Sequence, residues 1–357
     1  QLPDTDALFF CVLPLLTPDS NQDQLLVGSS DGSVQEWDMG LGQCVDQLSL
    51  GPALSVVSLA APRLSAPRAP PVVAAAMPAG EGAQAPVIAV LTQRQGEPWN
   101  EAARVGQRGL RVVSKVEFLR ASNHLVVAAQ ETESGGHHLG MYDISQAVGG
   151  GGGRPMLASF RHHTEVISDV AVLSPQTFAS CSFDATVAVW DLRNSDRKPA
   201  VVIQPSLLRA EMDDFGGLPG FQALSPQLSS ISASLSGMTI SLTSLEGMLF
   251  VYDLRRPTAP TVASAELVPG SGVRVHTFSD NASTFAAVCT TEGLFSVEVT
   301  PEVLVVQRPE ARAAVGVPER PGFPTAKMGF FYDVARSPVS GDLYAVSTGV
   351  VRYKFAA

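Results

Sequence analysis

Residues 28–32 (GSSDG) fit the pattern GxSxG, in which a strained strand-to-helix turn presents a nucleophilic serine for acyl transfer. That chemistry needs a helix directly after the motif. Residues 33–38 (SVQEWD) instead alternate as a strand does. We therefore predict a hairpin turn here and no catalytic serine.

Pairs of histidines and carboxylates are the other groupings that could do chemistry. His137-His138 and His162-His163 are adjacent pairs, and neighbouring side chains on a strand point to opposite faces, so they do not converge on a metal. Asp213-Asp214 lies in a long segment without a regular pattern, which would not hold the geometry that general acid–base catalysis requires. The sequence contains no HExxH and no P-loop. We expect no metal, no cofactor and no catalytic residue.

Three segments of the chain share one sequence pattern. They are residues 25–38 (LLVGSSDGSVQEWD), 177–191 (TFASCSFDATVAVWD) and 239–253 (TISLTSLEGMLFVYD). Each has a β-rich stretch, a tight turn with Asp, Glu or Gly, and a second strand that ends in an aromatic residue followed by Asp. Such a pattern is typical of a β-hairpin.

The aromatic-Asp ending resembles the WD dipeptide of the WD-repeat (WD40) β-propeller family. His163, Ser180, Asp184 and Trp190 stand at the offsets of that family's structural residues. The resemblance implies hydrogen bonds from the indole through Ser and His to Asp. A buried indole N–H can only donate and needs an acceptor, which gives such a network a physical reason.

With this template we predict an all-β chain folded as a single β-propeller, with seven blades of four-stranded antiparallel sheets. The expected blades are residues 7–50, 53–112, 113–161, 163–204, 229–267, 272–308 and 327–357. Long inserted loops are expected at 62–70, 94–111, 146–153, 205–228 and 309–326. The last blade shows three strands, so it is either completed by the N-terminal residues 1–6, by residues before Gln1 or by a partner's strand, or left short.

Two regions are candidates for partner binding. In the family, the face with the loops that enter the inward strands usually meets partners. By position, this implies Leu54, Ser55, Glu165, Ile167, Asp169, Phe183, Ser271, Arg274, Phe323 and Met328. The second region is the insertion 205–228, whose apolar residues recur every three to four positions and either pack on the chain's own edge or dock another protein. They include Leu208, Met212, Phe215 and Phe221.

Composition narrows the function classes. The net charge is −10, so the basic footprint that phosphate binding requires is missing overall, and we expect no direct nucleic-acid binding. No apolar run reaches the roughly 18 residues of a membrane helix, so no membrane insertion is expected. Four scattered cysteines without a CxxC suggest a reducing compartment, the cytoplasm or the nucleus.

We therefore expect a non-catalytic protein–protein interaction scaffold, a subunit of a larger intracellular multiprotein assembly, with no requirement for a homo-oligomer. One alternative is a reader of short basic or modified peptides, which needs an acidic channel mouth. The other is an enzyme with a site on the propeller face, which needs carboxylates, histidines or metal ligands that converge from several blades.

Overall fold

The structure is a computed structural model of the 357-residue chain. It describes residues 7–15, 23–51, 54–62, 72–78, 85–93, 97–105, 110–120, 122–131, 135–145, 156–205, 207–211, 220–258, 260, 262–264, 272–280, 283–291, 293–299, 304–307, 311–315, 331–347 and 350–353.

Apart from one separate hairpin, the described strands form antiparallel sheets of four, and in every sheet but the last the strands follow the order of the chain. The first sheet contains β1 (Phe9–Leu15), β2 (Gln24–Ser29), β3 (Ser33–Asp38) and β4 (Gln43–Ser49). The second contains β5 (Leu54–Ala60), β6 (Val72–Pro78), β7 (Val87–Thr92) and β8 (Asn100–Arg104). The third contains β9 (Leu110–Phe118), β10 (His124–Glu131), β11 (His137–Asp143) and β12 (Met156–Phe160).

Four further sheets have the same size. The fourth contains β13 (Ile167–Ser174), β14 (Thr177–Ser182), β15 (Val187–Asp191) and β16 (Val201–Ile203). The fifth contains β19 (Leu228–Ala233), β20 (Thr239–Ser244), β21 (Leu249–Asp253) and β22 (Val262–Ser264). The sixth contains β23 (Gly272–Asp280), β24 (Ser283–Thr290), β25 (Gly293–Val299) and β26 (Leu304–Gln307). The seventh has the order β27-β30-β29-β28, with β27 (Ala311–Val315), β28 (Asp333–Arg336), β29 (Leu343–Val346) and β30 (Val350–Tyr353).

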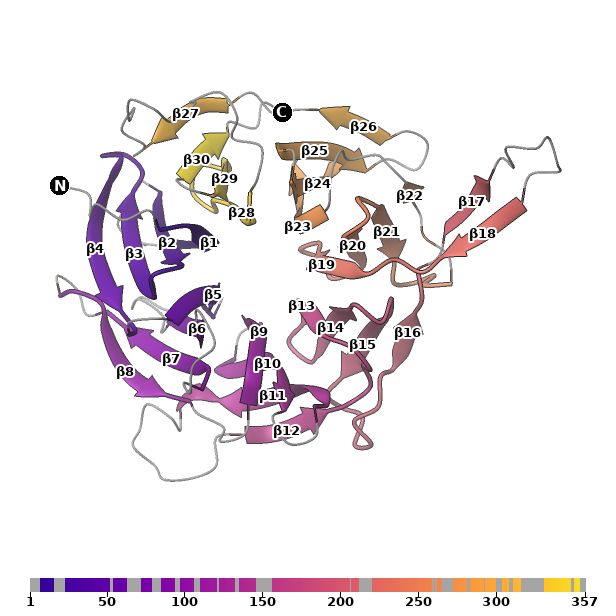
Figure 1. Ribbon diagram of the computed structural model, residues 1–357, viewed down its shortest axis with the longest axis horizontal. Coiled ribbons are helices and arrows are strands. Elements are labelled where there is room, and N and C mark those ends of the chain that lie inside the picture. The colour runs from indigo at the N-terminus through magenta and orange to yellow at the C-terminus, as the bar shows by residue number, and fades with distance from the viewer. Residues whose placement is uncertain are drawn as a thin grey trace.

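The sheets are arranged around a central axis, with one strand of each sheet innermost (Figure 1). The inner strands β1, β5, β9, β13, β19, β23 and β28 each contact the next, and β28 also contacts β1. The apolar core lies between neighbouring sheets. One buried cluster, for example, joins Leu139 and Phe160 of the third sheet to Ile167, Phe178 and Trp190 of the fourth. Each sheet thus buries both faces against its neighbours, and this burial drives the assembly.

A β-bulge recurs near the start of the inner strands and decides which side chains face the axis. The pairing register shifts between the first and third residues of β1, β13, β19 and β23. The third residues are Cys11, Asp169, Ser230 and Arg274. Because a bulge redirects the side chains next to it, these four residues come to equivalent positions on different sheets.

The structure corrects the predicted end of the chain. The outer strand of the last sheet is β27, which pairs antiparallel with β30, so the described strands alone give this sheet four strands. Residues 311–315 were expected inside a loop because their surroundings are rich in Pro and Ala. Residues 1–6 lie outside the described residues, and the first described strand, β1, is the inner strand of the first sheet.

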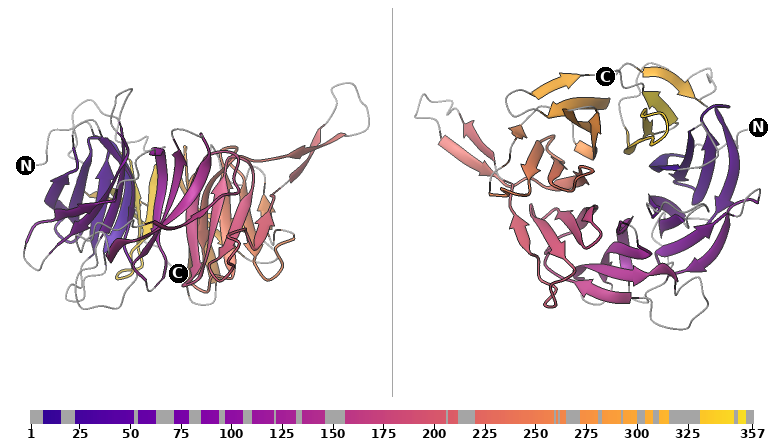
Figure 2. Two further views of the ribbon diagram at one scale, coloured as in Figure 1. Left: turned by 90° about the horizontal axis from the view of Figure 1, so that it is seen from below. Right: turned by 180° about the vertical axis from the view of Figure 1, so that it is seen from behind.

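Two other predicted loops also contain strands. The range 94–111 includes β8, and β9 already begins at Leu110, three residues before the predicted boundary at 113. In the range 205–228, β17 (Leu207–Glu211) and β18 (Gly220–Leu224) form a separate antiparallel hairpin, and β19 begins at Leu228. Figure 2 shows this hairpin extending away from the ring. The predicted loops at 62–70 and 146–153 fall almost wholly outside the described residues.

Candidate functional site

His163, Ser180, Asp184 and Trp190 are brought together in one chain of hydrogen bonds. The Trp190 indole N–H donates to Ser180 Oγ at 2.9 Å, and Ser180 Oγ lies 2.8 Å from His163 Nε2. His163 Nδ1 lies 3.0 Å from Asp184 Oδ2, which also accepts the backbone N–H of Thr164. Burial alone would raise the pKa of Asp184, but the hydrogen bonds from His163 and its neighbours outweigh it and hold the pKa below its ordinary value.

This Ser–His–Asp order matches that of a hydrolase triad, but the serine is inaccessible. Ser180 has no exposed surface, and its oxygen already accepts the indole hydrogen bond. A nucleophile must reach a substrate carbonyl, which Ser180 cannot do from this position. The network therefore ties the fourth sheet to the segment that precedes it.

The first sheet uses a different network around its own tryptophan. Val27 occupies the position of Ser180 and offers no acceptor, and Trp37 Nε1 donates instead to Gln35 Oε1 at 3.1 Å. Gln35 in turn donates to Ser33 Oγ, and Ser33 Oγ lies 2.8 Å from Ser29 Oγ. Sequence reasoning missed Gln35. The available signal was its spacing, because residues two apart on a strand share a face.

The GxSxG motif forms the turn between β2 and β3, as its following residues indicate. The central Ser30 is held by local contacts: its Oγ accepts the backbone N–H of Leu8 at 2.9 Å, and its carbonyl accepts Ser55 Oγ at 3.0 Å. Neither contact prepares the hydroxyl for attack.

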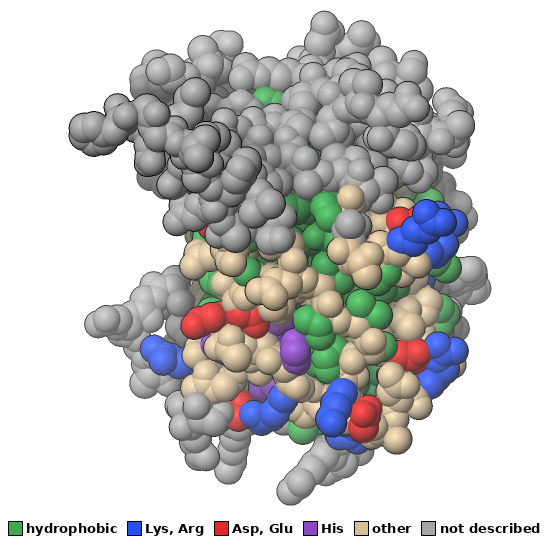
Figure 3. Space-filling model, turned by 90° about the vertical axis from the view of Figure 1, so that its right-hand side faces the viewer, with side chains coloured by type: hydrophobic (Ala, Val, Ile, Leu, Met, Phe, Trp, Pro, Cys, Tyr) green, Lys and Arg blue, Asp and Glu red, His purple; other side chains and the backbone are tan. Residues whose placement is uncertain are grey.

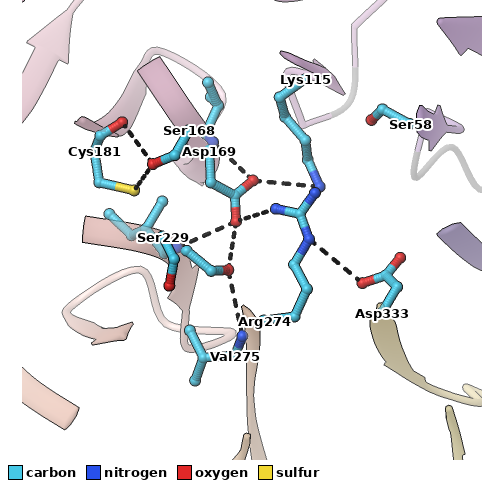
Figure 4. Close-up of polar contacts among 12 residues, drawn as sticks. Ser58, Lys115, Ser168, Asp169, Cys181, Ser229, Arg274, Val275 and Asp333 are labelled. Carbon is cyan, nitrogen blue, oxygen red and sulfur yellow. Dashed lines mark hydrogen bonds and ion pairs between the residues drawn. The ribbon is translucent and has the colours of Figure 1, made fainter. Parts of the chain in front are cut away.

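A cluster of four charged residues crosses the central axis, and we call it the axial charge cluster: Lys115, Asp169, Arg274 and Asp333 (Figure 4). Asp169 Oδ1 lies 3.3 Å from Lys115 Nζ, and Asp169 Oδ2 lies 3.0 Å from an Arg274 terminal nitrogen. The Arg274 Nε lies 3.8 Å from Asp333 Oδ1. The four residues come from β9, β13, β23 and β28, and two cations balance two carboxylates.

Hydrogen bonds extend the axial charge cluster to two further sheets. Asp169 Oδ2 accepts Ser230 Oγ at 2.6 Å and the backbone N–H of Ile231 at 3.1 Å, both on β19. Asp333 Oδ2 accepts the backbone N–H of Val12 on β1 at 3.0 Å. The cluster thereby links six of the inner strands, β1, β9, β13, β19, β23 and β28.

The pKa values of the two carboxylates, Asp169 and Asp333, are shifted in opposite directions. Burial raises the pKa of both, but for Asp169 the nearby Lys115 and Arg274 outweigh burial and the pKa is lowered. For Asp333 burial dominates over Arg274 and Lys115, and the pKa is raised. Asp169 therefore holds its negative charge more firmly than Asp333 does.

The cysteines near the axis are unreactive in this setting. Burial raises the pKa of the Cys11, Cys181 and Cys289 thiols, so little nucleophilic thiolate forms at neutral pH. Among the described residues, no group of three or more His, Cys, Asp or Glu side chains is arranged to hold a metal ion.

A cavity of about 1190 Å³ lies along the axis on one side of the axial charge cluster. The four cluster residues line its inner end. The remaining lining comes largely from the ends of the inner strands and the turns that follow, such as Arg120, Leu235 and Val339. Leu54 and Ile167, at the starts of their strands, do not line it, so the cavity belongs to the face where the inner strands end.

Comparison with known proteins fits this geometry. Residues 154–191 match the family model described as "WD domain, G-beta repeat". This segment is a WD40 repeat. It contains the whole hydrogen-bond network from His163 to Trp190, and the resemblance to WD-repeat proteins is confirmed.

Solved structures of WD40 proteins share the fold of the whole chain. "Structure of U3-55K" has a TM-score of 0.68 at 12% identity and covers 99% of this chain and 97% of that one. "Crystal structure of RRP9 WD40 repeats" has a TM-score of 0.67 at 12% identity, with 99% and 96% covered. A search of curated proteins finds no match. The predicted all-β WD40 fold of four-stranded antiparallel sheets is confirmed.

The WD40 fold places the predicted partner residues in three different environments. Leu54 and Ile167 are 3% and 2% exposed and pack in the cores between sheets, so a partner cannot contact them. Asp169 and Arg274 belong to the axial charge cluster and are likewise occupied. All four residues lie at or near the start of an inner strand, as predicted. The bulge and the neighbouring sheets, however, turn their side chains inward.

The other predicted partner residues are exposed, half-buried or outside the described residues. Glu165 is exposed, while Ser55 and Phe183 are half-buried. Leu208 lies on β17 and Phe221 on β18, both in the projecting hairpin. The remaining candidates lie outside the described residues: Met212, Phe215, Ser271, Phe323 and Met328.

Proposed function

We propose that the chain is a non-catalytic scaffold, a subunit of a larger intracellular protein assembly, built as a seven-bladed propeller over the blade ranges 7–50, 53–109, 110–161, 163–204, 228–267, 272–307 and 311–357. Seven four-stranded sheets and the contact of β28 with β1 support the blade count. Hydrogen bonds from Phe9 N to the Ser347 carbonyl and from Val12 N to Asp333 support a closed ring.

The main support for the scaffold role is that the side chains which could be reactive already have hydrogen-bond or ion-pair partners within the chain. Ser180, His163 and Asp184 satisfy one another around a buried indole, and the carboxylates of the axial charge cluster face cations. Residues engaged in this way hold sheets together and are unavailable to a substrate. Binding then falls to exposed turns and edges, which propellers present in large number.

The outer edge offers apolar surface for such binding. Figure 3 shows apolar side chains between basic groups on the side of the ring that carries β16. Val202 on β16 is 47% exposed and Leu157 on β12 is 40% exposed. Exposed apolar groups on edge strands offer places where another protein can pack.

The alternatives have weaker support. A reader of basic peptides needs carboxylates with free charge at the channel, whereas Asp169 and Asp333 share Lys115 and Arg274. An enzyme needs an accessible nucleophile or acid–base pair.

Within the described ranges, no helix has the length and apolarity to cross a lipid bilayer. The free cysteines support a reducing compartment, either cytoplasm or nucleus.

The test is affinity purification from cells with cross-linking mass spectrometry, using the wild type and a Glu165→Arg variant. Glu165 is exposed beside the start of β13, so reversal of its charge disturbs that face without altering the core. Asp196→Arg, an exposed change between β15 and β16, is the matched control. We expect stable co-purifying proteins that cross-link to this face and are depleted in Glu165→Arg alone. Recovery of the chain by itself would contradict the scaffold role.

A further inference from the structure

The mouth of the axial cavity carries exposed apolar side chains. Leu235, in the turn between β19 and β20, is 67% exposed, and Val339, in the turn between β28 and β29, is 39% exposed. Both line the cavity together with the exposed Pro338. Apolar groups at the rim of a concave site are typical anchors for a bound segment.

The turn that presents Leu235 is held in place by contacts from two other sheets. Arg120, which follows β9, donates to the carbonyl of Leu235 at 2.6 Å and to that of Ser234 at 3.3 Å. Gly237 has a φ of +71° and lies so close to Leu173 that an added Cβ would come within 2.1 Å of its carbonyl oxygen. Because the turn is fixed before binding, little conformational entropy is lost when a ligand packs on Leu235.

The charge of the lining differs from that of the chain. The axial charge cluster at the inner end is neutral overall. Among the described residues, the other charged residues of the lining are Arg120, Arg336 and Glu117, and His276 also lines the cavity. The described part of the lining is thus slightly basic in a chain whose net charge is −10. Such a local reversal favours a negatively charged ligand.

The size and composition of the cavity together indicate the class of ligand. A volume of about 1190 Å³ exceeds the roughly 300–1,000 Å³ of most small-molecule pockets. A bare polyanion would make no use of Leu235 and Val339, whereas a peptide can offer both carboxylates and apolar side chains.

We propose that this mouth binds an acidic peptide segment of a partner protein, with apolar residues against Leu235 and Val339 and carboxylates facing Arg120 and Arg336. The site is distinct from the Glu165 face and takes from the proposed scaffold role only the idea that the ligand is a protein. It also reverses the charge expected for a peptide reader, since the ligand here is acidic.

The test is fluorescence anisotropy with the purified full chain and labelled short peptides built from Glu, Leu and Ser. Matched probes replace Glu by Lys, replace Leu by Ser, or are a single-stranded oligonucleotide of similar length. We expect the Glu/Leu peptide to bind at least about tenfold more tightly than each matched probe, and more weakly at high salt. Equal affinity for the Lys peptide, or tighter binding of the oligonucleotide, would overturn the proposal.

Variants locate the binding. Leu235→Asp and Val339→Asp should each weaken the Glu/Leu peptide about tenfold, whereas Leu41→Asp, a 63% exposed residue outside the lining, should leave affinity unchanged. Because all three side chains are exposed, the variants should keep the wild-type melting temperature. Unchanged affinity in folded Leu235→Asp would refute the site.

A photo-cross-linker at position 235 identifies what occupies the mouth of the cavity. We expect it to capture the added peptide. Capture of another segment of the same chain instead would overturn the proposal, because the mouth would then be filled from within. Neither result bears on complexes recovered through the Glu165 face, so the two proposals fail separately.

Discussion

Asp333 on β28 accepts a hydrogen bond from the backbone N–H of Val12 on β1 at 3.0 Å, although 321 positions separate the two residues. The same carboxylate faces Arg274, whose guanidinium also pairs with Asp169. A single network therefore connects the first and last sheets with the middle of the ring, and removal of one of its buried charges should be strongly destabilising.

Substitutions of the two carboxylates in the axial charge cluster should lower the free energy of unfolding to different extents. Asp169→Asn removes the carboxylate that faces both Lys115 and Arg274, and we expect a loss of about 3–5 kcal/mol in the free energy of unfolding. Asp333→Asn should cost clearly less, because burial already raises the pKa of Asp333 and its amide oxygen can still accept from Val12. Urea denaturation at neutral pH measures both. Equal losses, or the reverse order, would contradict this account.

Gln35→Met should destabilise the first sheet. The substitution keeps the side-chain length but leaves the buried Trp37 N–H without its acceptor, at a cost of about 1–3 kcal/mol. Gln47→Met, on the exposed face of β4, is the matched control and should be neutral. Chemical denaturation followed by circular dichroism compares the two. If both variants unfold alike, the Gln35 contact is unimportant.

The stability supplied by Asp184 should depend on pH in a defined direction. Its pKa is lowered from 3.8 in the folded state, so the unfolded chain takes up the proton first as pH falls. The stabilisation is therefore complete above the ordinary pKa and is lost as pH drops through and below it. The difference in unfolding free energy between wild type and Asp184→Asn should be constant from about pH 7 to about pH 5 and shrink below about pH 4. If the difference in unfolding free energy instead grew as the pH fell, the pKa of Asp184 would not be lowered in the folded state.

The β17–β18 hairpin should be dispensable for folding. Leu207 pairs with Leu224, so the ends of residues 207–224 lie side by side and a short Gly-Ser link can replace the segment. The deletion must stop before Leu228, which is fully buried in β19. We expect an unchanged melting temperature by calorimetry and reduced partner recovery in pull-downs. The same set of recovered proteins would mean that the hairpin does not dock a partner.

The sequence predicts the hairpins of this protein well and the long-range pairings poorly. The segment from His163 to Trp190 is recognisable because its signals are local: strand alternation, a tight turn, and a donor-only indole that needs acceptors. β27 was missed because ARAAV has weak strand character and its partner, β30, lies some forty positions later, beyond any hairpin signal.

The axial charge cluster could be predicted only in part. Asp169 and Arg274 were chosen by their position near the starts of inner strands, as partner-binding residues and not as an ion pair. Lys115 and Asp333 were missed, because other charged residues stand on the same strands, β9 and β28. What the sequence does not contain is the relative height of four strands from four sheets, which the bulges set, so the pairing emerges only in three dimensions.

The strand order of the last sheet has a consequence for synthesis on the ribosome. β30, the final described strand, lies between β27 and β29, so neither of these neighbours has its full set of backbone partners until Tyr353 has left the exit tunnel. β1 therefore meets a complete seventh sheet only after β30 has been made, although the second sheet, its other neighbour, can form much earlier. A nascent chain stalled before this point would expose unpaired edges to chaperones, whereas every earlier sheet could already have formed.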